Sequence, residues 1–132
     1  MELLRWKTRI AVLWIIHMVS FSAYLILSSV EPKVMPAPQT GSLQISEGTK
    51  FGWVFLFCVP WIMAWLSLTL KDAANRWTNF VFGILFAAIL ILTLIGSFTG
   101  GASAALQFNI FWGFVVSLLI IWYAWKWPKQ EA

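Results

Sequence analysis

The sequence predicts an all-α fold, a transmembrane four-helix bundle with both chain termini on the cytoplasmic side of the membrane. The 132-residue chain is 61% hydrophobic and only 11% charged. A soluble fold of this size would expose too much of that apolar surface to water. The chain also contains four stretches without Asp, Glu, Lys or Arg, each close to the roughly 20 residues that a helix needs to cross a bilayer.

These four stretches are the expected membrane spans. They show no strand-like alternation, and backbone groups inside lipid must be hydrogen-bonded within the protein, so each span is expected to be a helix. The spans cover residues 10–30, 51–70, 77–98 and 106–125. Together they predict a single integral membrane domain, 1–132, in which the one long connection is an outer loop at 31–50 that contains five of the turn-forming Pro and Gly residues.

The charges between the spans predict the orientation, because short loops rich in Lys and Arg stay on the cytoplasmic side. One side of the predicted bundle carries seven basic residues. They are Arg5, Lys7, Arg9, Lys71, Arg76, Lys126 and Lys129. On the other side, Lys33 and Lys50 are balanced by Glu31 and Glu47. Both termini are therefore expected in the cytoplasm.

Several functional classes are disfavoured by what the sequence lacks. The basic residues lie near span ends and form no patch, so the net charge of +4 does not indicate nucleic-acid binding. There is one cysteine, Cys58, and hence no CxxC pair. Paired carboxylates, an HExxH motif and a phosphate-binding glycine loop are also missing, so no catalytic residue and no metal ligand are expected. The spans contain no charged residue, which argues against ion-coupled transport.

Two of the spans carry a stripe of small and polar residues at steps of four. Such residues let helix backbones approach each other closely in lipid. The stripes consist of Asn79, Gly83 and Ala87 in the third span and Asn109, Gly113 and Ser117 in the fourth. We expect these stripes to face each other or a neighbouring helix.

The first span is the most polar, and its polar residues share one helix face. They are His17, Ser20, Tyr24 and Ser28. At about 1.5 Å per residue, His17 lies roughly 10 Å inside the apolar layer, where its imidazole needs a partner. Two interpretations stay open, a hydrogen bond between helices or a role in binding a ligand such as a small molecule, a haem or a pigment.

The second span contributes Trp61 and Trp65, which lie one helical turn apart. These residues either pack between helices or join His17, Ser20 and Tyr24 in holding an aromatic ligand.

At the cytoplasmic ends of the last three spans, basic and aromatic residues are candidates for contact with anionic lipid headgroups. Simple anchoring at the interface is the alternative. The candidates are Lys71, Arg76, Trp77 and Lys126.

Two segments carry a resemblance to known proteins. The first, LSLTLKDAANRWTN, contains Asn75, Arg76, Trp77 and Asn79, and the second, IIWYAWKWP, contains Trp122, Tyr123, Trp125, Trp127 and Pro128. They resemble a family of small, uncharacterised bacterial four-span membrane proteins, and the similarity in span spacing extends along the whole chain. The resemblance implies a compact four-helix fold in the bacterial inner membrane and implies no activity. A more distant similarity to DoxX-like membrane proteins rests on the number of spans.

The sequence thus favours a non-enzymatic protein of the lipid bilayer. The first functional hypothesis is a subunit, scaffold or accessory factor of a membrane assembly, as a homo-oligomer or with other chains. The alternative is a binder or carrier of a small neutral or lipophilic ligand, including a pigment or haem, that uses the His17 face. The sequence identifies no particular cofactor.

Overall fold

The computed structural model describes residues 1–30 and 46–128, and this part of the chain folds into helices. They are α1 (Glu2–Val30), α2 (Glu47–Thr69), α3 (Asp72–Thr99) and α4 (Ala104–Trp125). Each of these four helices is long and apolar enough to cross a membrane. The prediction of an all-α fold with four such helices is therefore confirmed. Most of the expected outer loop, with Glu31 and Lys33, lies outside the described residues, as does Lys129.

The helices extend beyond the charge-free stretches that predicted them. α1 begins at Glu2 and α3 at Asp72, so both include basic residues that precede the apolar run. Charged side chains at a helix end can reach water while the backbone continues in helical form. The N-terminus of α2 is capped by Ser46, whose side chain accepts a hydrogen bond from the backbone N–H of Thr49.

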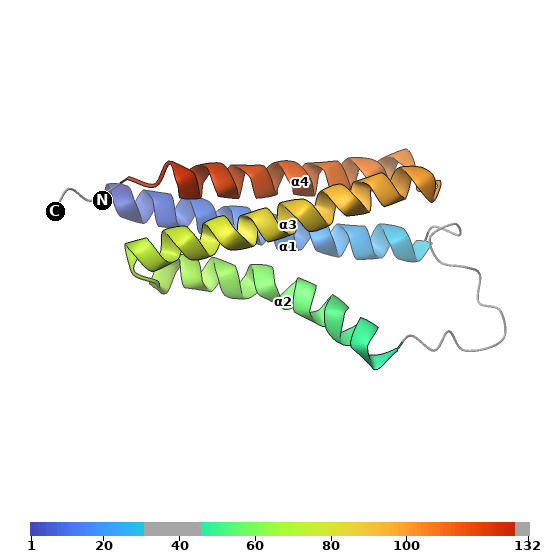
Figure 1. Cartoon of the computed structure of the whole chain (residues 1–132), viewed down its shortest axis with the longest axis horizontal. Coiled ribbons are helices and arrows are strands. Elements are labelled where there is room, and N and C mark those ends of the chain that lie inside the picture. The colour runs from blue at the N-terminus through green and yellow to red at the C-terminus, as the bar shows by residue number, and fades with distance from the viewer. Residues whose placement is uncertain (31–45, 129–132) are drawn as a thin grey trace.

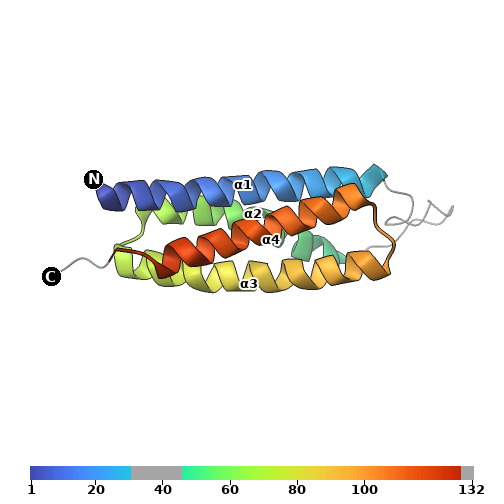
Figure 2. The ribbon, with the colours of Figure 1, turned by 90° about the horizontal axis from the view of Figure 1, so that it is seen from above.

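The helices pack in the spatial order α2, α1, α4 and α3, and the contact between α2 and α3 is small. α3 packs against α4, and α1 packs against both α2 and α4. α2 makes few contacts with α3 and departs from it toward its beginning at Glu47 (Figure 1). In the view from above, α4 crosses between α1 and α3 (Figure 2). The bundle is therefore more open on the side where α2 begins.

Two ends of the bundle are distinguished by their charges. We call the end that holds the start of α1, the α2–α3 turn and the end of α4 the basic end (Figure 1). The opposite end, which holds Val30, Glu47 and the α3–α4 turn, is called the far end. In the α3–α4 turn, Gly101 has a φ of 68°, a conformation that glycine adopts without steric cost.

Pro60 divides α2 into two parts with different surroundings. It lies inside the helix and is buried. Proline has no N–H to donate and its ring clashes with the carbonyl one turn earlier, so a helix bends at such a position. The part of α2 before Pro60 is the part that departs from α3 (Figure 1).

The two stripes of small residues face neighbouring helices and not each other. A Cβ at Gly83 would lie 2.9 Å from Cγ1 of Ile121, so α3 approaches α4 closely at this point. A Cβ at Gly113 would lie 3.4 Å from Cδ1 of Leu90 in α3 and 3.7 Å from Oγ of Ser20 in α1. The stripe on α4 is therefore turned toward α1 and toward a part of α3 outside the other stripe.

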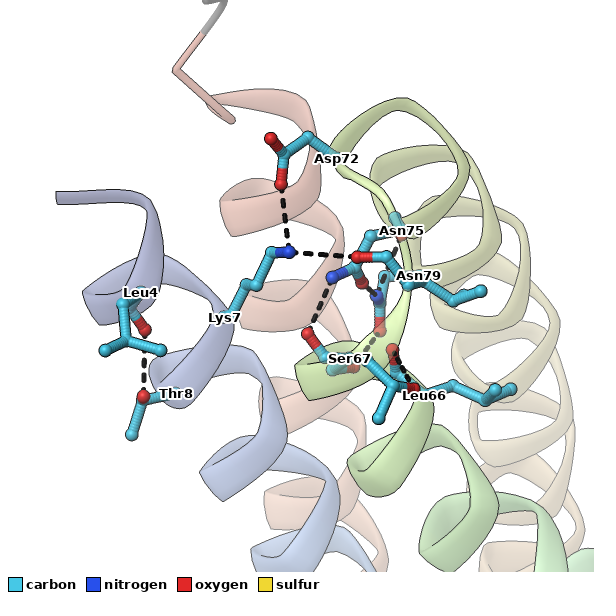
Figure 3. A network of polar contacts seen from close by, with 10 residues as sticks. Leu4, Lys7, Thr8, Leu66, Ser67, Asp72, Asn75 and Asn79 are labelled. Carbon is cyan, nitrogen blue, oxygen red and sulfur yellow. Dashed lines mark hydrogen bonds and ion pairs between the residues drawn. The ribbon is translucent and has the colours of Figure 1, made fainter. Parts of the chain in front are cut away.

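A buried polar network fixes the α2–α3 hairpin at the basic end (Figure 3). Ser67, Asn75 and Asn79 are each 0% exposed. Nδ2 of Asn75 donates to the backbone carbonyl of Ser67 across 2.6 Å, and Nδ2 of Asn79 donates to the carbonyl of Asn75 across 2.8 Å. Oδ1 of Asn79 accepts from Oγ of Ser67 at 3.0 Å and from Nε1 of Trp14 at 2.6 Å. The network thus joins α1, α2 and α3.

One basic residue of α1 reaches the same hairpin (Figure 3). Nζ of Lys7 lies 3.0 Å from Oδ1 of Asp72 and donates to the backbone carbonyl of Leu70 across 2.9 Å. That carbonyl belongs to the C-cap of α2, where the helix itself supplies no partner. Lys7 therefore contributes to holding the hairpin against α1.

A candidate ligand-binding cavity beside His17

A cavity of about 100 Å³ lies inside the bundle, on the side of His17 that faces the far end. All four helices contribute to its wall, which is mostly apolar. The polar residues on the wall are His17, Ser20 and Tyr24 from α1, Thr93 from α3 and Asn109 from α4. The cavity exists partly because Gly113, which also lines it, has no side chain to fill the space between α1, α3 and α4.

His17 lies at the inner end of this cavity and is 3% exposed. Its Nε2 is 3.1 Å from Oγ of Ser117, and that hydroxyl donates to the backbone carbonyl of Gly113 across 3.2 Å. A hydroxyl has one hydrogen, so when Ser117 donates to Gly113 it accepts from the N–H at Nε2 of His17. Nδ1 of His17 is then an acceptor, and it has no hydrogen-bond partner among the described residues.

Two aromatic rings hold the imidazole in place. The ring of Trp14 stacks on His17 with 5.8 Å between centroids, and Phe86 meets His17 edge-on at 5.1 Å. The interhelical hydrogen bond that the sequence left open for His17 is therefore present, and it connects α1 to α4. The same residue also borders the cavity, so the two roles that the sequence left open are compatible.

A second hollow of about 390 Å³ adjoins the cavity toward the far end. Tyr24, Thr93 and Ile110 line both spaces. The second hollow extends to Gly100 and Ala102 in the α3–α4 turn. The two spaces therefore lie next to each other between His17 and the turn at the far end.

The part of α2 before Pro60 contributes two residues to the cavity wall. Trp53 and Leu56 line the cavity from this helix. The Trp53 ring lies nearly parallel to two rings of α1, at 6.1 Å from Phe21 and 6.4 Å from Tyr24. These aromatic contacts are the means by which the outlying half of α2 stays beside α1.

The structure brings together only some of the residues that the sequence suggested for a ligand site. His17, Ser20 and Tyr24 share the cavity wall, but Trp61 and Trp65 are 66% and 64% exposed and lie on the outer face of α2. The face of α2 that packs inward contains its buried residues. They are Val59, Pro60, Met63, Ala64 and Ser67. Trp61 and Trp65 fall between these positions and therefore point away from the cavity.

Trp53, Thr93 and Asn109 belong to the cavity wall but were not expected there. Asn109 was assigned to a packing stripe, Trp53 follows the pattern of an interfacial tryptophan, and Thr93 lies in a long apolar run. Their proximity to His17 depends on how four helices are rotated about their axes. A single sequence carries no signal for that rotation.

The residues suggested for lipid headgroups lie at the basic end. Cζ of Arg76 is 5.8 Å from the centroid of the Trp77 ring. Phe80 contacts Trp77 at 6.0 Å and Trp125 of α4 at 5.7 Å, so an aromatic row connects the start of α3 with the end of α4. The two lysines of the set, Lys71 and Lys126, are exposed beside these helix ends.

The described residues contain no group of three or more His, Cys, Asp or Glu that could hold a metal ion. A haem or chlorophyll ring is also far too large for the cavity, because an engineered cavity of about 150 Å³ admits only a molecule the size of benzene. The volume beside His17 thus fits a molecule, or part of one, that is much smaller than a haem.

The described helices and the cavity define the class of protein. It is an all-α chain with four helices that are each long and apolar enough to cross a membrane, and these helices line a small, mostly apolar site. A family of unknown function, DUF6326, matches the chain over residues 1–132. The chain belongs to this family. Searches of curated proteins and of solved structures found no significant match.

Proposed function

We propose that the protein is a non-enzymatic membrane protein that binds a small, neutral, lipophilic molecule in the cavity between its four helices. The observation that carries this proposal is the cavity itself, walled by residues of all four helices, mostly apolar and with a few inward polar groups. Concave, apolar sites with a few convergent polar groups are typical of small-molecule binding.

The volume limits the size of the bound group. Since a cavity of about 150 Å³ can hold benzene, the 100 Å³ beside His17 suits a somewhat smaller group or one end of a larger molecule. The adjoining hollow of about 390 Å³ gives room for the remainder. An elongated molecule with a compact end fits both spaces.

The wall also favours a neutral ligand. No Asp, Glu, Lys or Arg lines the cavity within the described part of the chain. A charged group there would lose its hydration without gaining a counter-ion, at a cost of several kcal/mol. A neutral molecule needs only the hydroxyl, amide and imidazole groups of residues such as Tyr24, Asn109 and His17.

The chain is proposed to cross the cytoplasmic membrane of a bacterium four times, with both termini inside. Arg5, Lys7 and Arg9 lie at the same end of the bundle as the basic residues of the α2–α3 turn and of the end of α4 (Figure 1). By the positive-inside rule this basic end faces the cytoplasm. The cavity then opens toward the outer side.

A role as subunit, scaffold or accessory factor of a membrane assembly is the second candidate function. The exposed Trp61 and Trp65 favour it, because two large aromatic side chains one turn apart offer a contact surface for another membrane helix. Site-specific photo-crosslinking at position 61 in native membranes tests this candidate. A crosslinked partner, either another chain or a second copy, is the expected result, and crosslinks to lipid alone would contradict it.

Contact with anionic lipid headgroups is proposed for the four residues that the sequence suggested, which are Lys71, Arg76, Trp77 and Lys126. Trp77 is exposed beside Arg76, and Lys71 and Lys126 extend from neighbouring helix ends. A cluster of basic and aromatic groups at the basic end suits contact with an anionic membrane surface.

Ligand binding is tested with 1,4-difluorobenzene as a probe and with the protein in lipid nanodiscs. Saturation-transfer ¹⁹F NMR, corrected by empty nanodiscs, measures the bound probe. Gly113→Leu places a side chain into the cavity and is expected to abolish the protein-dependent signal. The matched control Gly52→Leu adds the same group at an exposed position of α2 where a Cβ would meet no atom within 4 Å and that lines neither space, so it should leave binding unchanged. Equal signals for Gly113→Leu and the unsubstituted chain would overturn the proposal.

A further inference from the structure

We propose that Arg9 forms a binding site for the phosphate of an anionic phospholipid, together with Trp6 of α1 and Tyr123 of α4. This site lies between α1 and α4 and is separate from the cavity. It is also separate from the residues at the start of α3. The proposal rests on the position of the guanidinium, on its lack of an acidic partner and on the charge of the surrounding surface.

Two aromatic rings define the position of the guanidinium. Cζ of Arg9 lies 5.8 Å from the centroid of the Trp6 ring and 6.0 Å from that of Tyr123. These distances are at the limit of about 6 Å within which a cation is attracted by a ring face. The rings themselves meet edge-on at 5.1 Å, and Trp122 packs on Tyr123 at 4.9 Å. Because the rings come from two helices, the packing of α1 on α4 fixes where the cation sits.

The charge of Arg9 is not neutralised by the described part of the chain. Two ion pairs are present there, Lys7 with Asp72 and Lys50 with Glu47, and neither involves Arg9. Lys7 lies only two residues earlier in α1, but it points into the hairpin and has its own partners. Arg9 is exposed and points to another side of the helix. Its counter-ion therefore comes from outside this part of the protein.

The depth of Arg9 selects a lipid as the source of that counter-ion. At about 1.5 Å per residue, Arg9 lies roughly 10 Å along α1 from its start at Glu2, directly before buried Ile10. An arginine at the edge of the apolar layer is costly unless it reaches polar groups at the interface. The planar guanidinium matches a phosphate with two parallel hydrogen bonds. The indole and phenol rings beside it suit the glycerol region, which is neither fully wet nor fully apolar.

The surroundings favour an anionic over a zwitterionic lipid. Arg5, Lys71, Arg76 and Lys126 add positive charge at the same end of the bundle. A headgroup with a choline or ethanolamine would bring its own cation into this field, whereas phosphatidylglycerol would not. The proposed ligand is accordingly a phospholipid with net negative charge.

Native mass spectrometry of the full chain, released from nanodiscs of equal phosphatidylglycerol and phosphatidylcholine content, tests the proposal. The readout is the ratio of the two lipids that remain bound. We expect Arg9→Gln to lower this ratio about fivefold, the loss typical of one basic contact with an anionic lipid surface. Arg5→Gln is the matched control, because Arg5 is an exposed arginine one turn earlier and the cation–ring contacts of the described residues involve Arg9 and Arg76 but not Arg5. It should lower the ratio clearly less than Arg9→Gln does.

A second variant separates the formed site from general surface charge. Tyr123→Leu keeps every charge and removes one of the two rings, so it should also lower the ratio, by less than Arg9→Gln does. Equal losses for Arg9→Gln and Arg5→Gln, with no effect of Tyr123→Leu, would show general electrostatic attraction only and would overturn the proposal. An unchanged ratio in Arg9→Gln would overturn it as well.

Discussion

Nε1 of Trp14 donates a hydrogen bond to Oδ1 of Asn79 across 2.6 Å and so joins α1 to α3, two helices that are not packed side by side along their length. Both residues are 0% exposed. Inside an apolar bundle, helix association depends on such hydrogen bonds and on close packing more than on hydrophobic burial. The bond is therefore a specific determinant of how the α2–α3 hairpin sits against α1.

Replacing Asn79 by alanine should destabilise the fold. The change leaves the buried indole N–H of Trp14 without its acceptor, whereas the hydroxyl of Ser67 still donates to the backbone carbonyl of Met63 across 2.7 Å. We expect the free energy of unfolding to fall by about 2 kcal/mol. This value is smaller than in soluble proteins, because polar groups of the unfolded chain in a membrane also find hydrogen-bond partners. Unfolding by SDS in mixed micelles measures it. The control is Asn109→Ala, which removes a partly exposed amide from the cavity wall and should cost much less.

Close packing of α3 on α4 at Gly83 gives a second prediction. A methyl group there would lie 2.9 Å from Cγ1 of Ile121 and 3.5 Å from its backbone N, so Gly83→Ala forces the helices apart. We expect a destabilisation of about 1–3 kcal/mol, typical of overpacking. Gly96→Ala meets open space and should be neutral or slightly stabilising. Similar unfolding free energies for the two variants would show that this contact is not tight.

The ion pair of Lys7 and Asp72 gives a third prediction. Lys7→Gln should lower stability by about 1 kcal/mol, a small value because the two side chains are 18% and 30% exposed. The reversed pair, Lys7→Glu with Asp72→Lys, should recover only part of the loss. Glutamate cannot donate to the carbonyl of Leu70 as Lys7 does. Full recovery in SDS unfolding would mean that the Leu70 hydrogen bond contributes nothing.

The helices and their number could be predicted because each depends on composition over some 20 residues. Charge-free stretches locate the apolar part of a helix. They place the start of the helix too late where charged residues before the apolar part are also helical, as between Glu2 and Arg9 in α1. Lys7 shows the limit of the same reasoning. Its charge indicated an orientation, whereas its position on the helix face makes it a partner of Asp72 and Leu70.

The candidate site could be predicted only on one helix. The spacing of His17, Ser20 and Tyr24 places them on a common face, and the structure brings all three to the cavity. Which residues of other helices complete the wall depends on tertiary packing. Trp61 was suggested by its residue type and points outward, while Trp53, eight positions earlier in the same helix, is 41% exposed and lines the cavity with the rest of its surface.

The central claim is that the cavity beside His17 takes up a lipophilic molecule. A crystal structure of the protein soaked with bromobenzene tests it most directly, because bromine gives an anomalous signal at a definite position. The account predicts a bromine peak inside the bundle, next to Tyr24, Thr93 and Ile110, that disappears in Gly113→Leu crystals. Peaks confined to the outer surface of the helices, or an internal peak that persists in Gly113→Leu, would contradict it.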